Sequence, residues 1–94
     1  MRVTVLLPGV LTPDAGGRPE VVLDLADGAR VAAALDALRG SWPALGRRLV
    51  DDNGAVRRHV NLFVDGRDVR TTAGVDTPLA DGTVLHVLPS VAGG

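Results

Sequence analysis

One amphipathic stripe near the middle of the chain limits the folds that this sequence can adopt. Its apolar residues recur at the spacing of a single helix face, and they are Val31, Ala34, Leu35, Leu38 and Trp42. On either side of the stripe, apolar runs alternate at period two, which is the pattern of half-buried strands. A chain of 94 residues with one main helix and several strands indicates one domain, in which the helix covers one face of a single sheet.

Strands are expected on both sides of the helix. The strand-like runs occupy residues 2–7, 20–25, 59–64 and 83–88, with a shorter run at 67–70. Loops or irregular segments are expected at 12–19, 51–54 and 71–81, and a second short helical turn at 44–50. Asp27 is expected to cap the main helix or to lie in its first turn, and Gly40 and Pro43 to end it. Asp65-Gly66 is a strong tight-turn signal.

The order of these elements is strand, strand, helix, strand, short strand and strand. Packing one helix on one sheet in this order makes the first and last strands adjacent and parallel at the sheet centre. We therefore predict an α+β fold of the ubiquitin-like β-grasp type, with a mixed sheet of four to five strands covered by one main helix. The domain would span residues 1–88, and residues 89–94 would form a flexible C-terminal tail.

Composition excludes several classes of function. The net charge is −1, from 10 basic and 11 acidic residues, and no block of like charge exceeds two residues. Nucleic acids and anionic membranes require clustered basic residues, so neither is expected as a partner. There is no Cys, hence no disulfide frame and no thiolate site. Because no signal peptide or apolar run of transmembrane length is visible, a cytoplasmic location is expected.

The chain shows no catalytic or metal-binding constellation. His59 and His86 are the only histidines, and neither stands at metal-ligand spacing from a carboxylate, so no metal site is expected. Asp51-Asp52-Asn53-Gly54 lacks the spaced ligands of a calcium loop and is interpreted as a turn. No nucleophile–base or paired-carboxylate arrangement stands out. We therefore expect a protein that is not an enzyme and that binds no cofactor.

The last six residues, Pro89 to Gly94, are the most informative for function. Pro89 lacks an N–H and is expected to end the ladder of the last strand. Six extended residues span at most about 20 Å, which is enough to carry the Gly94 carboxylate into a partner's cleft. A frayed end that happens to be glycine is the alternative. The chain has no Lys and no Cys that could capture an activated carboxylate.

A docking surface is expected beside this tail. Alternation places Phe63, His86 and Leu88, together with Val84, on the face of the sheet opposite the helix. Clustered exposed apolar groups mark protein-binding surfaces, whereas scattered surface hydrophobes are the alternative. We predict partner docking through Phe63, His86 and Leu88.

Three segments resemble the small ubiquitin-like sulfur-carrier proteins of the MoaD/ThiS-like family. These segments are 60–66 (Val-Asn-Leu-Phe-Val-Asp-Gly), 77–82 (Thr-Pro-Leu-Ala-Asp-Gly) and 87–94 (Val-Leu-Pro-Ser-Val-Ala-Gly-Gly). The opening residues, the segment 68–70 and the ending most resemble the carrier of a cysteine-biosynthesis pathway. One departure is Arg30 at the helix start, where that type often has a small hydroxyl residue. The departure puts the helix cap in doubt, but not the function.

The resemblance implies that the chain carries sulfur on its C-terminus. An E1-like enzyme would adenylate Gly94 with ATP, and sulfur would displace AMP to leave a thiocarboxylate. Gly93, Ala92 and Val91 would thread into the partner's channel. The thiocarboxylate would donate its sulfur to an accepting synthase, such as a cysteine synthase-like enzyme, and a metallopeptidase would release cysteine.

Other functions remain open on the sequence. The chain could be a ubiquitin-like modifier conjugated through Gly94, the small subunit of a molybdopterin synthase, or an interaction module with an incidental tail. Within the sulfur-carrier interpretation, the sequence does not settle the sulfur-containing product, whether one carrier serves several pathways, the activating enzyme or the oligomeric state.

Overall fold

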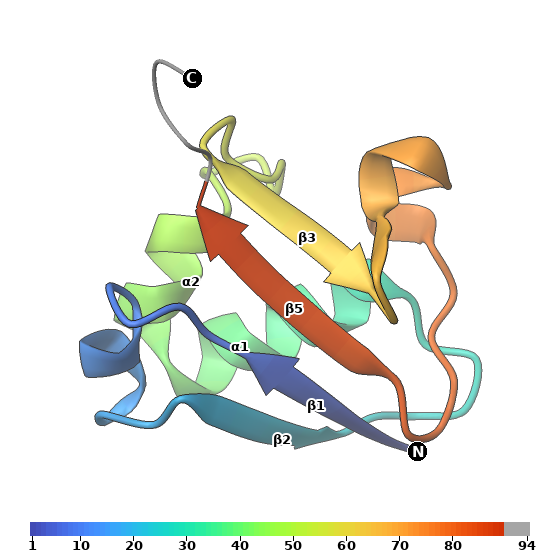
Figure 1. The fold of residues 1–94 in the computed structure, drawn as a ribbon, viewed down its shortest axis with the longest axis horizontal. Helices are drawn as coiled ribbons and strands as arrows, with labels where there is room; N and C mark the ends of the chain where they lie inside the picture. Colours follow the sequence, from blue (N-terminus) through green and yellow to red (C-terminus); the bar gives the residue numbers. More distant parts are fainter. Residues whose placement is uncertain (90–94) are drawn as a thin grey trace.

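The computed structural model describes residues 1–89, which build one mixed sheet of five strands (Figure 1). The strands are β1 (Arg2–Leu6), β2 (Glu20–Asp24), β3 (Val60–Val64), β4 (Arg67–Asp68) and β5 (Val84–Pro89). Their order across the sheet is β2-β1-β5-β3-β4. β1 and β5 pair in parallel, while the other neighbouring pairs are antiparallel. The predicted β-grasp arrangement is confirmed.

Two helices cover one face of this sheet, and the other face is turned toward the viewer in Figure 1. The main helix is α1 (Val31–Ser41), and α2 (Pro43–Leu49) follows it after one residue. Pro43 opens α2, where its missing N–H removes no helical hydrogen bond. Short 3₁₀ helices occupy parts of the segments expected to be irregular, and they are η1 (Thr12–Ala15) and η3 (Gly74–Asp76). The predicted short strand at 67–70 forms only as β4, because η2 (Val69–Thr71) begins directly after it. Among residues 1–89, no helix is long and apolar enough to cross a membrane.

The core lies between the sheet and the two helices. Its strand residues include Val3, Val5, Val21, Leu23, Val60, Leu62, Leu85 and Val87, and its helix residues include Val31, Ala34, Leu35, Leu38, Leu45 and Leu49. Leu25, Val64 and Trp42 are partly buried against this cluster. In β1, β2, β3 and β5, every second residue therefore belongs to the core or packs on it, as the period-two alternation predicts. Burial of this apolar surface is the main term that stabilises the fold.

The start of α1 differs from the prediction. Asp27 does not cap the helix, because α1 begins at Val31 and Asp27 lies three residues before the N-cap. The Asp27 carboxylate lies 3.6 Å from the amino group of Met1. Arg30 holds the N-cap position in an extended conformation and makes no side-chain cap bond. The backbone N–H of Val31 donates instead to the carbonyl of Thr77 at 3.0 Å. A tertiary contact thus satisfies a first-turn amide that a side chain was expected to bind.

The ends of α1 and β5 also run beyond the prediction. Gly40 lies inside α1, which ends at Ser41 with Trp42 as its C-cap. A single glycine weakens a helix without breaking it. β5 includes Pro89, in register with Val60 of β3. Proline is tolerated in this position because it removes only the last donor of the strand.

Gly46 sets how closely α1 and α2 approach. A Cβ placed on Gly46 would lie 2.8 Å from the Cα atom of Arg39 and 2.5 Å from its Cγ atom. The Cα atom cannot rotate away, so the helices would have to separate. We expect Gly46→Ala to lower the free energy of unfolding by about 1–3 kcal/mol. A thermal melt followed by circular dichroism measures this as a drop of about 4–8 °C per kcal/mol.

Gly40→Ala is the matched control for this variant. A Cβ at Gly40 meets no atom within 4 Å, and alanine favours a helix interior over glycine by about 0.5–1 kcal/mol. This control should melt at or above the temperature of the unmodified chain. Equal behaviour of the two variants would show that the contact between Gly46 and Arg39 does not limit the packing of the helices.

Candidate functional site

The face of the sheet that the helices leave bare carries the predicted docking residues. We call it the open face and define it by the outward residues of four strands. These are Thr4 and Leu6 of β1, Val22 of β2, Asn61 and Phe63 of β3, and Val84, His86 and Leu88 of β5. Their neighbours along each strand point into the core, so alternation places them all on one side of the sheet.

His86 lies at the centre of a row that crosses three strands. Its register partner on β3 is Phe63, and its partner on β1 is Leu6. Because neighbouring strands lie about 4.8 Å apart, the imidazole stands between an aromatic and an aliphatic side chain. All three residues are partly exposed. Leu88 follows His86 on the same face, toward the end of β5.

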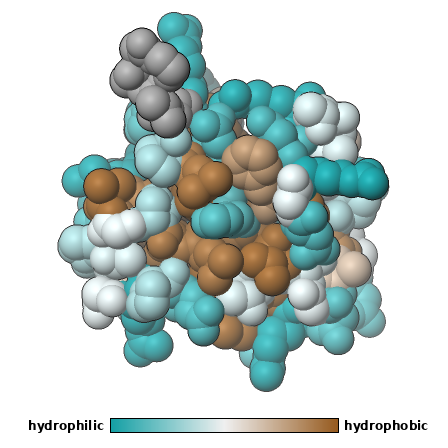
Figure 2. Space-filling view, viewed as in Figure 1, coloured by the Kyte–Doolittle hydropathy of each residue, from teal (hydrophilic) through white to brown (hydrophobic). Residues whose placement is uncertain are grey.

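Figure 2 shows this face with apolar surface gathered over its middle and a hydrophilic side chain within it. Charged residues stand at one side of the face, and Arg2, Glu20 and Asp24 are exposed there. An apolar centre with a polar rim is the composition of a protein-binding surface, and such clusters mark docking sites. The open face therefore has the chemistry to bind an apolar surface of another protein.

The end of β5 brings the chain beside the open face. Pro89 is the last described residue, and Leu88 of the open face directly precedes it. A small hollow of about 90 Å³ adjoins both of them, and its other lining residues are Val10, Leu11, Arg48, His59, Val60 and Val87. At its rim, Nε of Arg48 lies 2.7 Å from Oδ2 of Asp14, which ties α2 to η1. The start of the predicted tail is thus held next to an apolar side chain.

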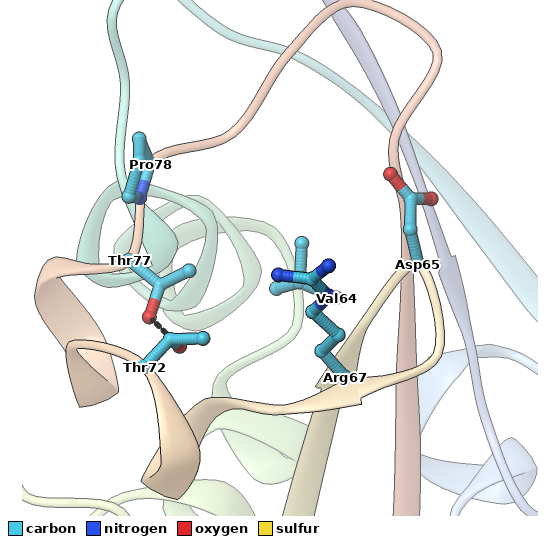
Figure 3. A pocket seen from close by; sticks show the side chains of 6 residues that line it. All are labelled: Val64, Asp65, Arg67, Thr72, Thr77 and Pro78. Atoms are coloured by element: carbon cyan, nitrogen blue, oxygen red, sulfur yellow. Dashed lines mark hydrogen bonds between the residues drawn. The ribbon is translucent and has the colours of Figure 1, made fainter.

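A second hollow, of about 340 Å³, lies at the other end of β5 (Figure 3). It is lined by Val64, Asp65, Arg67, Thr72, Thr77 and Pro78. Asp65 and Gly66 have φ values of 47° and 89°, which confirms the predicted tight turn. The Asp65 carboxylate accepts a hydrogen bond from the N–H of Val84 at 2.9 Å, and the hydroxyls of Thr72 and Thr77 lie 2.8 Å apart. The first of these bonds fixes the turn against the start of β5, and the second links the segments that follow η2 and η3.

The structure brings Phe63, His86 and Leu88 together on one face, as the alternation predicted. Their role in docking stays a prediction. The predicted chemical and threading positions lie outside the described residues, and they are Gly94, Gly93, Ala92 and Val91. His59 adjoins the hollow at the end of β5, whereas His86 lies in mid-strand. Within residues 1–89, no group of three His, Asp or Glu side chains could hold a metal ion.

Sequence reasoning overlooked two apolar members of the open face, Leu6 and Val22. Val22 is 51% exposed, a large value for a valine on a sheet. The signal for both was present, because an alternation that places Val5 and Leu7 inside places Leu6 outside, and burial of Val21 and Leu23 likewise places Val22 outside. Parallel pairing of the first and last strands then sets Leu6 beside His86.

The strand order, the parallel central pair and the one-sided helical cover define a ubiquitin-like β-grasp protein. The model of the ThiS family matches residues 5–94 of the chain. The chain therefore belongs to the ThiS family.

Several relatives of known name match most or all of the chain. It is 38% identical to the sulfur carrier protein CysO of Mycobacterium tuberculosis, over the full length of both chains. It also matches a chain in the crystal structure of the Amycolatopsis orientalis BexX/CysO complex, with a TM-score of 0.83 and 35% identity over 98% of this chain and 99% of that one. Small archaeal modifier protein 3 of Haloferax volcanii is 37% identical over 83% of this chain and 84% of that protein.

Proposed function

We propose that this chain is a sulfur-carrier protein whose Gly94 carboxylate is converted to a thiocarboxylate. The observation that carries the proposal is the full-length likeness to the sulfur carrier protein CysO. The chain ends in Gly93-Gly94, shortly after β5. Its resemblance to the cysteine-pathway type makes cysteine biosynthesis the proposed destination of the sulfur, and a related sulfur-incorporation pathway is the alternative.

The proposed chemistry begins with activation, because a free carboxylate is a poor electrophile. On an E1-like enzyme, an oxygen of the Gly94 carboxylate attacks the α-phosphorus of ATP, and pyrophosphate leaves. Hydrosulfide then attacks the carbonyl carbon, and the bond to AMP breaks. A persulfide donor could replace hydrosulfide in this step. Its attack would form an acyl disulfide, which a thiol would then reduce to the thiocarboxylate. The resulting thiocarboxylate is a sulfur nucleophile, and the chain is a substrate in each step rather than the catalyst.

The open face is the proposed recognition surface for these enzymes. Phe63 and Leu88 offer apolar contact, and His86, the register partner of Phe63, offers a hydrogen-bonding group beside them. A partner seated there lies beside Pro89, the last residue of β5. The five residues that follow Pro89 span at most about 17 Å when extended. A catalytic cleft within that distance of the docking surface would receive Gly94, with Val91, Ala92 and Gly93 in its entrance.

The proposed acceptor is a cysteine synthase-like enzyme that presents an activated serine derivative. A metallopeptidase would then release cysteine from the carrier, and the steps would take place in the cytoplasm. No cofactor is proposed to stay on the chain, since ATP is consumed by the activating enzyme. The complex of Amycolatopsis orientalis CysO with BexX supports the proposal that this chain docks onto another protein.

A second candidate function is conjugation to other proteins through Gly94. The likeness to small archaeal modifier protein 3 favours it. Because the chain has no Lys, lysine-linked chains of this protein cannot form. Immunoblots of cell extract under denaturing and reducing conditions separate the two functions. A ladder of high-mass adducts would favour the modifier, and a single band at the mass of the free chain would favour the carrier.

Intact mass spectrometry tests the proposed function. The purified chain is incubated with the E1-like enzyme of the same cell, ATP and a sulfide donor. We expect the mass increase of one oxygen replaced by one sulfur, and no increase when ATP is left out. The proposal fails if the cognate enzyme consumes ATP with the chain present and the mass of the chain does not change.

A further inference from the structure

β2 forms a free edge of the sheet, and its backbone offers unused hydrogen-bonding groups. The N–H of Leu25 donates to the carbonyl of Met1 at 2.8 Å, and the N–H of Leu7 donates to the carbonyl of Pro19 at 2.9 Å. Hydrogen-bonded pairs alternate along an antiparallel ladder. The backbone groups of Val21 and Leu23 therefore point to β1, and those of Glu20, Val22 and Asp24 point away from the sheet.

Nothing within residues 1–89 accepts from the N–H groups of Glu20, Val22 and Asp24. A row of unpaired donors and acceptors on an edge strand is a template for another strand. The other edge of the sheet is β4, which has only two residues before η2 begins. The edge of β2, with five residues, is the longer of the two.

The side chains along this edge indicate which kind of added strand it would bind. Those of Glu20, Val22 and Asp24 share the open-face side of the sheet, with the exposed valine between two carboxylates. Asp24 has a long ion pair with Arg2, in which Nε and Oδ1 lie 3.6 Å apart. That pair is exposed on both sides and contributes little. Both carboxylates are thus exposed and accessible to cations of an added strand.

A second copy of the chain is a poor occupant of this edge. Antiparallel pairing centred on Val22 would put Glu20 of each copy opposite Asp24 of the other, and parallel pairing in register would put like residues side by side. Both arrangements juxtapose carboxylates, which destabilises cross-strand pairs. The same charges favour a strand with basic residues at those two positions and an apolar residue between them.

We propose that the edge of β2 binds an extended basic segment of a partner protein. In this segment an apolar residue lies between two cationic residues, and one spacer residue separates it from each of them. The backbone of this segment pairs with Glu20, Val22 and Asp24, and its two cations meet the two carboxylates. β1 separates β2 from β5, so a partner held at this edge leaves the end of β5 uncovered. The binding does not depend on the chemistry of Gly94.

Solution NMR with a synthetic probe tests this edge. The probe is a capped peptide of the sequence threonine-lysine-threonine-valine-threonine-lysine-threonine, in which threonine and valine favour strands. We expect saturable shifts and slowed hydrogen exchange at the amides of Glu20, Val22 and Asp24, with smaller changes at Val21 and Leu23. A control peptide with glutamate in place of both lysines should bind about tenfold more weakly or less.

Charge reversal on the chain supplies the matched variant. The double substitution Glu20→Lys and Asp24→Lys changes two exposed side chains and should invert the preference between the two peptides. Equal affinity for both peptides, or shifts centred on Phe63 and His86 instead of β2, would overturn the proposal. Concentration-dependent dimerisation through β2 would also overturn it. If the variant does not fold, the relative affinities of the two peptides for the unmodified chain still test whether the edge of β2 prefers a basic strand.

Discussion

Deletion of Gly94 abolishes sulfur loading and leaves the thermal unfolding midpoint within about 1 °C of that of the full chain. Loading is lost because the terminal carboxylate moves to Gly93, one residue short of the reacting position. Stability is kept because the core residues of the described part of the chain end at Val87. Loading is measured by intact mass after incubation with the E1-like enzyme, ATP and sulfide, and stability by a circular dichroism melt.

Ser90→Ala is the control for this deletion. It alters a small side chain beyond β5 and keeps the diglycine end, so both loading and melting should match those of the unmodified chain. Loading of the shortened chain at the normal rate would show that the reacting group is not the terminal carboxylate at position 94. A large drop in the melting temperature would instead show that the end of the chain stabilises the fold.

Phe63→Asp weakens the affinity for the E1-like enzyme by about 10–100-fold, which corresponds to about 1.4–2.8 kcal/mol. The substitution removes the aromatic side chain beside His86 and sets a carboxylate in the apolar middle of the open face. Burying that carboxylate against a partner is costly unless the partner supplies a cation. Isothermal titration calorimetry of the chain with the enzyme measures the affinity.

Ala44→Asp provides the same added charge on the other side of the molecule. Ala44 is exposed in the first turn of α2, where a carboxylate is favourable to the helix. This variant should bind the enzyme as the unmodified chain does. If both variants bind equally well, and both melt normally, the open face is not the docking surface.

Most of the fold could be predicted because the apolar residues that alternate along each strand in the sequence are the residues that the structure buries. Val3 and Val5 of β1, and Leu85 and Val87 of β5, are buried on a strict period of two. Once these strands are taken as central and parallel, the register brings Leu6 and His86 together. The open face was therefore within reach of sequence reasoning, although Leu6 and Val22 were not singled out.

The details that could not be predicted depend on contacts between distant parts of the chain. The N–H of Val31 donates a hydrogen bond to the carbonyl of Thr77, and the sequence around Asp27 contains no pattern that predicts this bond. Pro89 belongs to β5 because it pairs with Val60 of β3, although proline locally tends to end a strand. The free edge of β2 likewise emerges only from the strand order and the alternation of hydrogen-bonded pairs.

Locating the sulfur atom within the chain tests the central claim most directly. Arg70 is the last basic residue, so trypsin releases residues 71–94 as the C-terminal peptide. After incubation with the E1-like enzyme, ATP and sulfide, fragmentation of this peptide should place one sulfur, in exchange for one oxygen, on Gly94. A peptide that stays unmodified while ATP is turned over, or a sulfur placed on any other residue, would contradict the account.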